Sequence, residues 1–336
     1  MANQSTSMNF IQHQAGQKRP LNDCQEVETQ DGFPYIVFDT ETTGLSLKKD
    51  RIVQLSMIKV LSKTHHETFD EYINPELPRS FQLQSKAYKI HNLHPDFLNQ
   101  QSPFQKTHAE DILKFLDDIK YVFGHNVLFD WGFLVTAFTN LGVNEETGKP
   151  WVKMLKQLDF KLVDTMKMSV VAYPELQWYR LSDLVKHLDI DKVKVSASAP
   201  KKMKAGGPTR KGELHDALVD VLVTNQVIFN LMDTLHLTLD DISEDSKFSY
   251  RISDLDLINK AINSPSSVTE GERKLLTEIA EKTMSRERFS KGRFLKDSDT
   301  GLLEKEVDYI IKKRNGIADQ IEIKLRRILI QHRTQR

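Results

Sequence analysis

Two periodicities alternate along the chain from residue 34 to about residue 235. Short apolar runs rich in β-forming residues predict buried strands over residues 35–38 and 121–124. Strands are also predicted over 52–61, where polar and apolar residues alternate in part, over 67–73 and over 161–165. The first three along the chain follow one another closely, as in paired hairpin strands. Apolar residues at helical spacing predict helices over 109–119, 130–141, 181–188 and 218–235. This order predicts an α/β fold with a mixed five-stranded sheet flanked by helices.

The pattern divides the chain into three parts. Residues 1–32 are polar and carry few apolar side chains, which predicts a flexible N-terminal arm. Residues 33–240 hold the predicted sheet and form one domain. Residues 247–336 hold 20 Lys/Arg against 14 Asp/Glu, with apolar residues spaced over 302–330, and are predicted to form a small basic helical region.

One internal segment, 192–211, has seven Lys/Arg, no acidic residue and the sequence Gly-Gly-Pro. We expect a mobile basic loop there. The loop is either a solvated surface segment or a flap that contacts phosphates, and the sequence leaves both open.

Composition excludes several classes of protein. No apolar run approaches the roughly 18 residues of a membrane span, so no membrane partner is expected. The single cysteine, Cys24, excludes an internal disulfide framework and a cysteine zinc site. The N-terminus lacks the charged-then-apolar pattern of a signal peptide, which together with the cysteine count predicts a cytoplasmic protein. The formal net charge is zero, so attraction to nucleic acid would depend on local charge.

The candidate chemistry begins directly after the first strand. Asp39 and Glu41 are two residues apart, so on a strand both carboxylates would point the same way at its carboxyl end. Thr42, Thr43 and Gly44 follow, and they offer hydroxyls, backbone N–H groups and a residue without Cβ where a ligand can approach closely. An isolated Asp-X-Glu is a common surface feature, but its place after a buried strand favours a site.

Two further segments carry candidate ligands. Asp130 follows His-Asn-Val-Leu-Phe at the start of a predicted helix, where an isolated carboxylate would be a simple cap. His215 and Asp220 are five residues apart, so on one helix they would lie about 140° apart. They converge only if His215 belongs to the segment that enters the helix. Four carboxylates and one imidazole suit a site that holds two divalent ions and cuts phosphodiesters.

Taken together, the three segments resemble the DEDDh 3′-to-5′ exonucleases, the family of the bacterial replicative proofreading subunit, ribonuclease T and oligoribonuclease. The resemblance covers residues 34 to about 235 and includes Ile-His-Asn-Leu at 90–93 and Leu-Ser-Asp-Leu at 181–184. Asn92 and Asp216 stand where the proofreading subunit has glycine. The resemblance implies a ribonuclease H-like fold and removal of nucleotides one at a time from 3′ ends, releasing 5′-monophosphates.

The resemblance also implies a role for each candidate residue. Asp39, Glu41 and Asp220 would hold one metal ion, with Asp39 bridging to a second ion that Asp130 supports, and His215 would be the general base. Two Mg²⁺ or Mn²⁺ ions are the implied cofactors, which agrees with the preference of hard cations for oxygen ligands.

Substrate contacts are implied as well. Thr42, Thr43, Gly44 and Leu45 would line the pocket for the terminal nucleotide, and Asn126 would contact the nucleic-acid backbone. His91 would either touch a phosphate or cap its own turn.

Three hypotheses about function differ in class. The leading one is a metal-dependent exonuclease acting most readily on 3′ ends of single-stranded DNA, with RNA as an open alternative because spacing does not show how the pocket meets a 2′-hydroxyl. The second is a polymerase-associated proofreading or interaction subunit that docks through residues 247–336, although that tail could equally pack on its own domain. The third, a catalytically silent nucleic-acid-binding module, is disfavoured because every carboxylate and the histidine are present.

Overall fold

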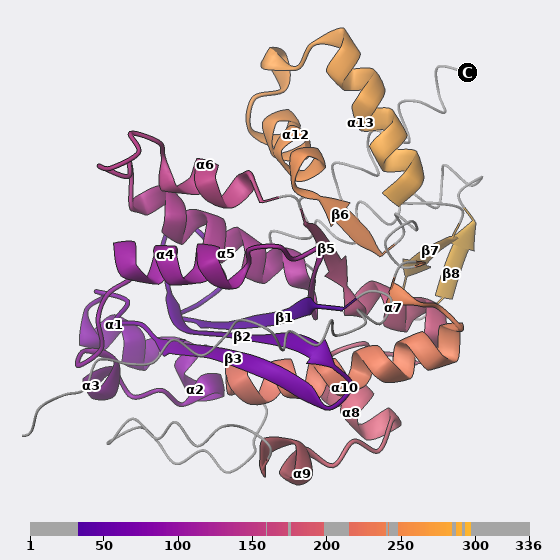
Figure 1. The fold of residues 1–336 in the computed structure, drawn as a ribbon, viewed down its shortest axis with the longest axis horizontal. Coiled ribbons are helices and arrows are strands. Elements are labelled where there is room, and N and C mark those ends of the chain that lie inside the picture. Colours follow the sequence, from indigo (N-terminus) through magenta and orange to yellow (C-terminus); the bar gives the residue numbers. More distant parts are fainter. Residues whose placement is uncertain are drawn as a thin grey trace, which may run out of the picture.

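A six-stranded mixed sheet forms the centre of the molecule, with strand order β3-β2-β1-β4-β5-β6 (Figure 1). This computed structural model describes residues 33–158, 160–173, 176–197, 215–239, 241, 248–283, 287–290 and 293–296. The strands of the sheet are β1 Tyr35–Thr42, β2 Ile52–Ser62, β3 His65–Tyr72, β4 Tyr121–Gly124, β5 Lys161–Asp164 and β6 Ser249–Arg251. A separate hairpin pairs β7 Glu287–Ser290 with β8 Arg293–Lys296.

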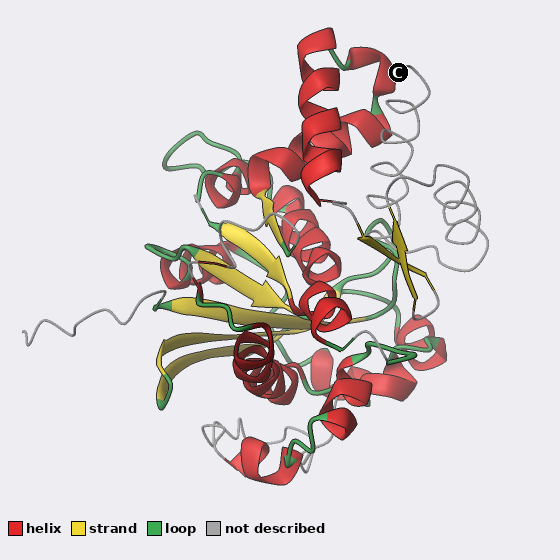
Figure 2. Ribbon diagram, turned by 90° about the vertical axis from the view of Figure 1, so that its right-hand side faces the viewer, coloured by secondary structure: helices red, strands yellow, loops and turns green. Residues whose placement is uncertain are grey.

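Helices cover both faces of this sheet (Figure 2). They are α1 Arg79–Gln84, α2 Tyr88–His91, α3 Pro95–Leu98, α4 Lys106–Phe115, α5 Val127–Asn140, α6 Trp151–Lys156, α7 Thr165–Ala172, α8 Leu181–His187, α9 Lys192–Ala197, α10 Ala217–Leu235, α12 Ile252–Asn263 and α13 Glu270–Thr283, with a 3₁₀ turn at Pro265–Ser267. Strands β1, β4 and β5 are parallel, whereas β2, β3 and β6 run antiparallel to their neighbours. The α/β, ribonuclease H-like prediction is confirmed.

The two faces of β1 contribute to two different hydrophobic cores. Ile36 and Phe38 pack into the core formed with α4, α5 and α6, whereas Tyr35 and Val37 pack into the core formed with α7 and α10. All four side chains are almost wholly buried, which is why this strand reads as a continuous apolar run. The alternation then decides on which face each later residue of β1 lies.

Helix α10 passes through the second core. It is the one helix in the described part of the chain that is long and apolar enough to cross a membrane. Its buried side chains pack against the sheet instead, and Asn225 accepts a 2.7 Å hydrogen bond from the hydroxyl of Tyr35 on β1. Helix α10 is therefore a core helix, and its N-terminal end lies at the carboxyl end of β1.

The prediction of five strands is wrong by one strand. Strand β6 adds three residues to the outer edge of β5, pairing Lys161 with Arg251 and Val163 with Ser249. Helices α12 and α13 then continue from it, and Ile258, Leu276 and others join the same core as α5 and α6. In Figure 1 these two helices stand above the sheet. Much of 248–279 is therefore built into the core beside the sheet.

The loop predicted over 192–211 is also corrected in part. Residues 192–197 form α9, because the Asp191 side chain accepts hydrogen bonds from the first backbone N–H groups of the helix, those of Val193 and Lys194 (3.1 and 3.2 Å). Val195 packs beside α10. The remainder of that segment lies outside the described residues. The predicted arm over 1–32 and the apolar spacing over 302–330 lie outside them too.

The packing of α12 generates a stability prediction. Ile258 is fully buried in the core shared with Trp131 and Phe160, so Ile258→Ala should lower the free energy of unfolding by about 2–5 kcal/mol. Urea denaturation followed by circular dichroism measures this. Leu275→Ala, at a side chain that is 45% exposed on α13, is the control and should change little. A loss below about 0.5 kcal/mol for Ile258→Ala would contradict the packing of α12 on the central core.

Candidate active site

The site begins where β1 leaves the two cores. Asp39 and Glu41 continue the face of Tyr35 and Val37, so both carboxylates lie on the side of the sheet covered by α10. Glu41 is buried, and in the register between β1 and β2 it pairs with Gln54 of β2. The register between β1 and β2 shifts between Glu41 and Thr42, a bulge of the kind that re-aims side chains beside active sites.

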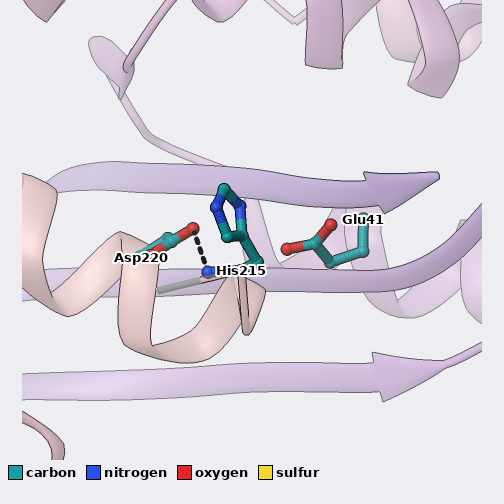
Figure 3. A group of neighbouring side chains, drawn as sticks. All are labelled: Glu41, His215 and Asp220. Carbon is teal, nitrogen blue, oxygen red and sulfur yellow. Dashed lines mark hydrogen bonds between the residues drawn. The ribbon is translucent and has the colours of Figure 1, made fainter. Parts of the chain in front are cut away.

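The start of α10 brings His215 and Asp220 to Glu41. His215 lies before the helix in a left-handed turn with φ of +78°, and its backbone N–H donates a 3.1 Å hydrogen bond to Oδ2 of Asp220 (Figure 3). This turn removes the angular separation that a continuous helix would impose. One ligand atom from each of Glu41, His215 and Asp220 lies within 4.8 Å of the others.

Asp130 reaches the end of β1 from α5, which lies on the opposite face of the sheet from α10. It is 3% exposed in the first turn of α5, and its Oδ1 accepts hydrogen bonds from the backbone N–H (2.9 Å) and the hydroxyl (2.6 Å) of Thr40. Thr40 lies between Asp39 and Glu41, so Asp130 is fastened to the middle of the Asp-X-Glu sequence. The structure therefore brings all three sequence motifs to the carboxyl end of β1.

The closeness of the carboxylates alters their pKa values. Burial raises the pKa of Asp39 well above its ordinary value, and the charges of Asp130, Asp220, Glu41 and Asp216 raise it further. Burial raises the pKa of Asp130 to about 7, although the two hydrogen bonds from Thr40 act in the opposite direction. Carboxylates that raise one another's pKa in this way favour the binding of cations.

The residues present fit divalent metal ions. Carboxylate oxygens dominate the set, as Mg²⁺ and Mn²⁺ require, and one histidine nitrogen lies beside them. Asp39, Glu41, Asp130 and Asp220 would hold such ions. Glu41 and Asp220 are largely buried while His215 is exposed, so the cluster is open to solvent on the histidine side.

A buried polar network behind the site was missed in the sequence. The side-chain amide of Gln54 donates to Asp216 and to Asp70, each at 3.0 Å, and its carbonyl accepts from the backbone N–H of Ala217 at 3.4 Å. Ser56 donates a 2.6 Å hydrogen bond to the same oxygen of Asp70. The network ties the start of α10 to β2 and β3.

The sequence did contain a signal for this network. Gln54 and Ser56 are polar residues two apart within an otherwise apolar strand, and both are fully buried. Such a pair points to one face of the sheet and must find hydrogen-bond partners there. Asp70, directly opposite Ser56 in the β2–β3 register, is one of them.

The segment after β1 folds back on a buried aspartate. Asp50 accepts hydrogen bonds from the hydroxyl of Thr43 (3.0 Å) and the backbone N–H of Ser46 (2.9 Å). A Cβ on Gly44 would lie 2.6 Å from Oδ2 of Asp50, so any side chain at that position would have to displace the Asp50 carboxylate. The hydroxyl of Thr42 donates to the carbonyl of Gly44 at 2.7 Å. Leu45 projects from this compact loop with 73% of its surface exposed.

The two remaining predicted substrate contacts occupy turns. His91 is buried at the end of α2, and its Nδ1 accepts a 3.0 Å hydrogen bond from the backbone N–H of Leu93, which is the turn-capping geometry. Asn92 has a φ of +55°, a left-handed conformation that asparagine tolerates better than most residues. Asn126 is also left-handed, and its backbone N–H donates to Asp164 at 3.0 Å, just before α5 begins. Contact of His91 and Asn126 with substrate stays a prediction.

The architecture defines the class. An Asp-X-Glu at the end of the central strand, one aspartate from a helix on each face of the sheet and a histidine before the second helix together make the DEDDh arrangement of a 3′-to-5′ exonuclease domain. The sequence model described as "Exonuclease", of the ribonuclease T type, matches residues 36–228. The chain belongs to this exonuclease family.

Individual relatives agree with the family. The PolC-type DNA polymerase III of Bacillus subtilis is 32% identical over 157 residues, which cover 47% of this chain and 10% of that protein. The 3′-5′ exonuclease DinG of the same species is 26% identical over 157 residues, covering 46% and 15%. The chain thus spans about a tenth of the length of the PolC-type polymerases that it matches.

Two solved structures resemble part of the chain at low sequence identity. Exonuclease X, solved with 5′ overhanging duplex DNA, has a TM-score of 0.41 and 17% identity over 62% of this chain and 98% of that one. A complex of E. coli exonuclease I with single-stranded DNA has a TM-score of 0.44 and 20% identity over 63% and 43%.

The buried network predicts that Gln54 positions the catalytic segment. Gln54→Leu removes the donor shared by Asp70 and Asp216 and frees the start of α10, so kcat for oligonucleotide digestion should fall about 10- to 100-fold while KM changes little. Gln100→Leu, at an exposed glutamine beyond α3, is the matched control. Unchanged kcat in Gln54→Leu would show that the start of α10 holds its place without this amide.

The crowding of carboxylates predicts a pH dependence of stability without divalent ions. Because the folded-state pKa of Asp130 is about 7 and its ordinary value is 3.8, the folded protein binds more protons than the unfolded chain between those values. Its stability therefore falls as the pH rises through that window. Asp130→Asn keeps an oxygen to accept the bonds from Thr40 and removes the charge. Urea unfolding in EDTA should show the variant more stable than wild type by roughly 1–4 kcal/mol at pH 8 and by little near pH 4. An equal difference at both pH values would contradict the assignment.

Proposed function

We propose that this protein is a metal-dependent exonuclease that removes nucleotides from the 3′ ends of single-stranded DNA and releases 5′-monophosphates. The observation that carries the proposal is the convergence of Glu41, His215 and Asp220 within 4.8 Å, with Asp130 fastened to the same strand end through Thr40. The names of the relatives, a DNA polymerase and a 3′-5′ exonuclease, support DNA as the substrate.

Each residue has a separate task in this proposal. Asp39, Glu41, Asp130 and Asp220 hold two Mg²⁺ or Mn²⁺ ions, which when bound stabilise the attacking and leaving oxygens of the phosphodiester. His215 accepts the proton of the attacking water, a task that suits an imidazole because it changes protonation near neutral pH. Its exposed side chain, on the open side of the cluster, is accessible to that water.

The loop that follows β1 would hold the terminal nucleotide. Thr42, Thr43 and Gly44 form a tight turn whose shape is fixed by Asp50, and this turn presents Leu45 to solvent. An exposed leucine beside a metal-binding carboxylate pair suits contact with the last base. A rigid loop orders the substrate with less loss of entropy than a flexible one.

A replication partner remains a prediction for the C-terminal region. The part of 247–336 that the structure describes, from β6 through α13, contributes buried residues to the chain's own core. A docking role would therefore fall mainly to the residues beyond 296.

The test uses a 5′-labelled single-stranded DNA of about 20 nucleotides. With Mg²⁺ the wild type should shorten it stepwise from the 3′ end, and EDTA should stop the reaction. His215→Ala should lower kcat by roughly 10²- to 10⁴-fold, and Asp39→Asn should remove detectable activity, because each group acts in the chemical step. Asp111→Asn, at an exposed carboxylate of α4, is the matched control and should digest at the wild-type rate.

Two outcomes would contradict the proposal. Full activity of His215→Ala and Asp39→Asn would remove the mechanism. Faster digestion of a matched RNA oligomer than of the DNA would retain the mechanism and change the substrate to RNA.

A further inference from the structure

Residues 176–180, which precede α8, lie at the same edge of the sheet as the catalytic cluster. His125, the residue after β4, contacts the backbone carbonyl of Tyr179 through Nε2 at 2.7 Å and the hydroxyl of Thr165 through Nδ1 at 3.0 Å. In the parallel register Val37 pairs with Phe123, and β4 ends one residue later, so His125 leaves β4 beside the end of β1 that carries Asp39. Neighbouring strands are about 4.8 Å apart. Residues 176–180 are thus held near the site.

The two residues that follow Trp178 are fixed in place. Tyr179 is 6% exposed, and its hydroxyl donates a 2.8 Å hydrogen bond to the carbonyl of Tyr173. The guanidinium of Arg180 donates two hydrogen bonds to the carboxylate of Asp183, at 2.7 and 3.2 Å. A planar guanidinium held in this bidentate way has little freedom to rotate. The backbone that directly follows Trp178 is therefore anchored.

Trp178 itself is exposed to solvent. Its side chain is 58% exposed, while the other two tryptophans of the chain, Trp131 and Trp151, are 6% and 1% exposed. The guanidinium carbon of Arg180 lies 6.0 Å from the centre of the Trp178 ring. Single exposed apolar residues are common and need no explanation. Trp178 differs from such residues, because the backbone that follows it is anchored, a cation lies beside its ring, and it lies at the edge of the sheet that holds the catalytic cluster. Its exposure therefore calls for an explanation.

We propose that Trp178 and Arg180 form a stacking subsite for one base of the nucleic-acid strand, upstream of the bond that is cut. The inference rests on the proposed function. An aromatic ring beside a guanidinium binds any of the four bases by stacking, so this subsite holds the strand without reading its sequence. Because Tyr179 contacts His125 after β4, one strand away from the carboxylates of β1, the stacked base belongs to a nucleotide some way from the 3′ terminus.

The first experiment compares kinetic constants on substrates of different length. Trp178→Ala should raise KM for single-stranded oligonucleotides of ten or more nucleotides about 5- to 100-fold, with kcat nearly unchanged, because the lost contact is made equally in ground and transition states. Trp178→Phe should restore most of the affinity. Dinucleotides, which do not reach the subsite, should be cleaved alike by all three proteins. Val143→Ala, at a 53% exposed residue beyond the far end of α5, is the control.

A second experiment identifies the base that stacks. Single abasic nucleotides are placed at successive positions from the 3′ end, and at one upstream position the abasic substrate should raise the wild-type KM as Trp178→Ala does. On Trp178→Ala that same abasic position should have no further effect, since the two changes remove one contact.

Fluorescence gives a readout that does not depend on turnover. Trp178 is the most exposed tryptophan, so binding of an oligonucleotide to the inactive Asp39→Asn variant should quench the protein's tryptophan emission. Adding Trp178→Phe to that variant should abolish the quenching while most binding remains.

Each result separates the subsite from the proposed function. If the wild type digests DNA but Trp178→Ala keeps the wild-type KM on long oligonucleotides, the subsite is wrong and the exonuclease function stands. An equal loss on dinucleotides and long substrates would also overturn it, because it would place Trp178 in the terminal pocket. If the wild type digests no nucleic acid, the proposed function itself fails.

Discussion

The mutual repulsion of carboxylates at the end of β1 is the constraint on which the rest of the structure depends. Burial and the charges of Asp130, Asp220 and Glu41 all raise the pKa of Asp39, so this arrangement costs folding free energy when metal is absent. Such a cost persists only when the surrounding framework fixes each group in place. The central strand supplies that framework, because its first four residues are buried on both faces before the first carboxylate appears.

The same constraint explains why the helix dipoles matter here. Asp130 and Asp220 both lie in the first turn of their helices, where the partial positive charge of the helix end favours a carboxylate. Two helices on opposite faces of the sheet therefore deliver negative charge to one point and offset part of its cost. His215 joins them only because the chain turns left-handed before α10, and the Gln54 amide holds the neighbouring Asp216 while this happens.

The sequence alone predicted the carboxylates and most of the sheet, for identifiable reasons. Strands β1 to β5 are marked by apolar runs or alternation, and a charged pair directly after a buried strand is rare unless it is used. Strand β6 was missed because three residues, Ser-Tyr-Arg, are too few to show a period. Helix α9 was missed because charge and Gly-Pro content dominate its surroundings. The pairing of Gln54 with Asp216 could not be predicted, since it depends on a contact across 162 residues.

What the sequence predicts least well is also what decides the substrate. The geometry of the carboxylates serves the phosphodiester, which is common to every nucleic acid, and so it is shared across the family. We propose that selection among polymers depends on exposed residues outside the carboxylate cluster, where Leu45, Ile90 and Trp178 are each more than half exposed. None of these residues has a periodic neighbour that would mark it, and their exposure follows from turns fixed by Asp50, His91 and His125. Hydrogen bonds of polar side chains thus fix the shape of these loops, and the exposed apolar side chains of the loops are accessible to a base.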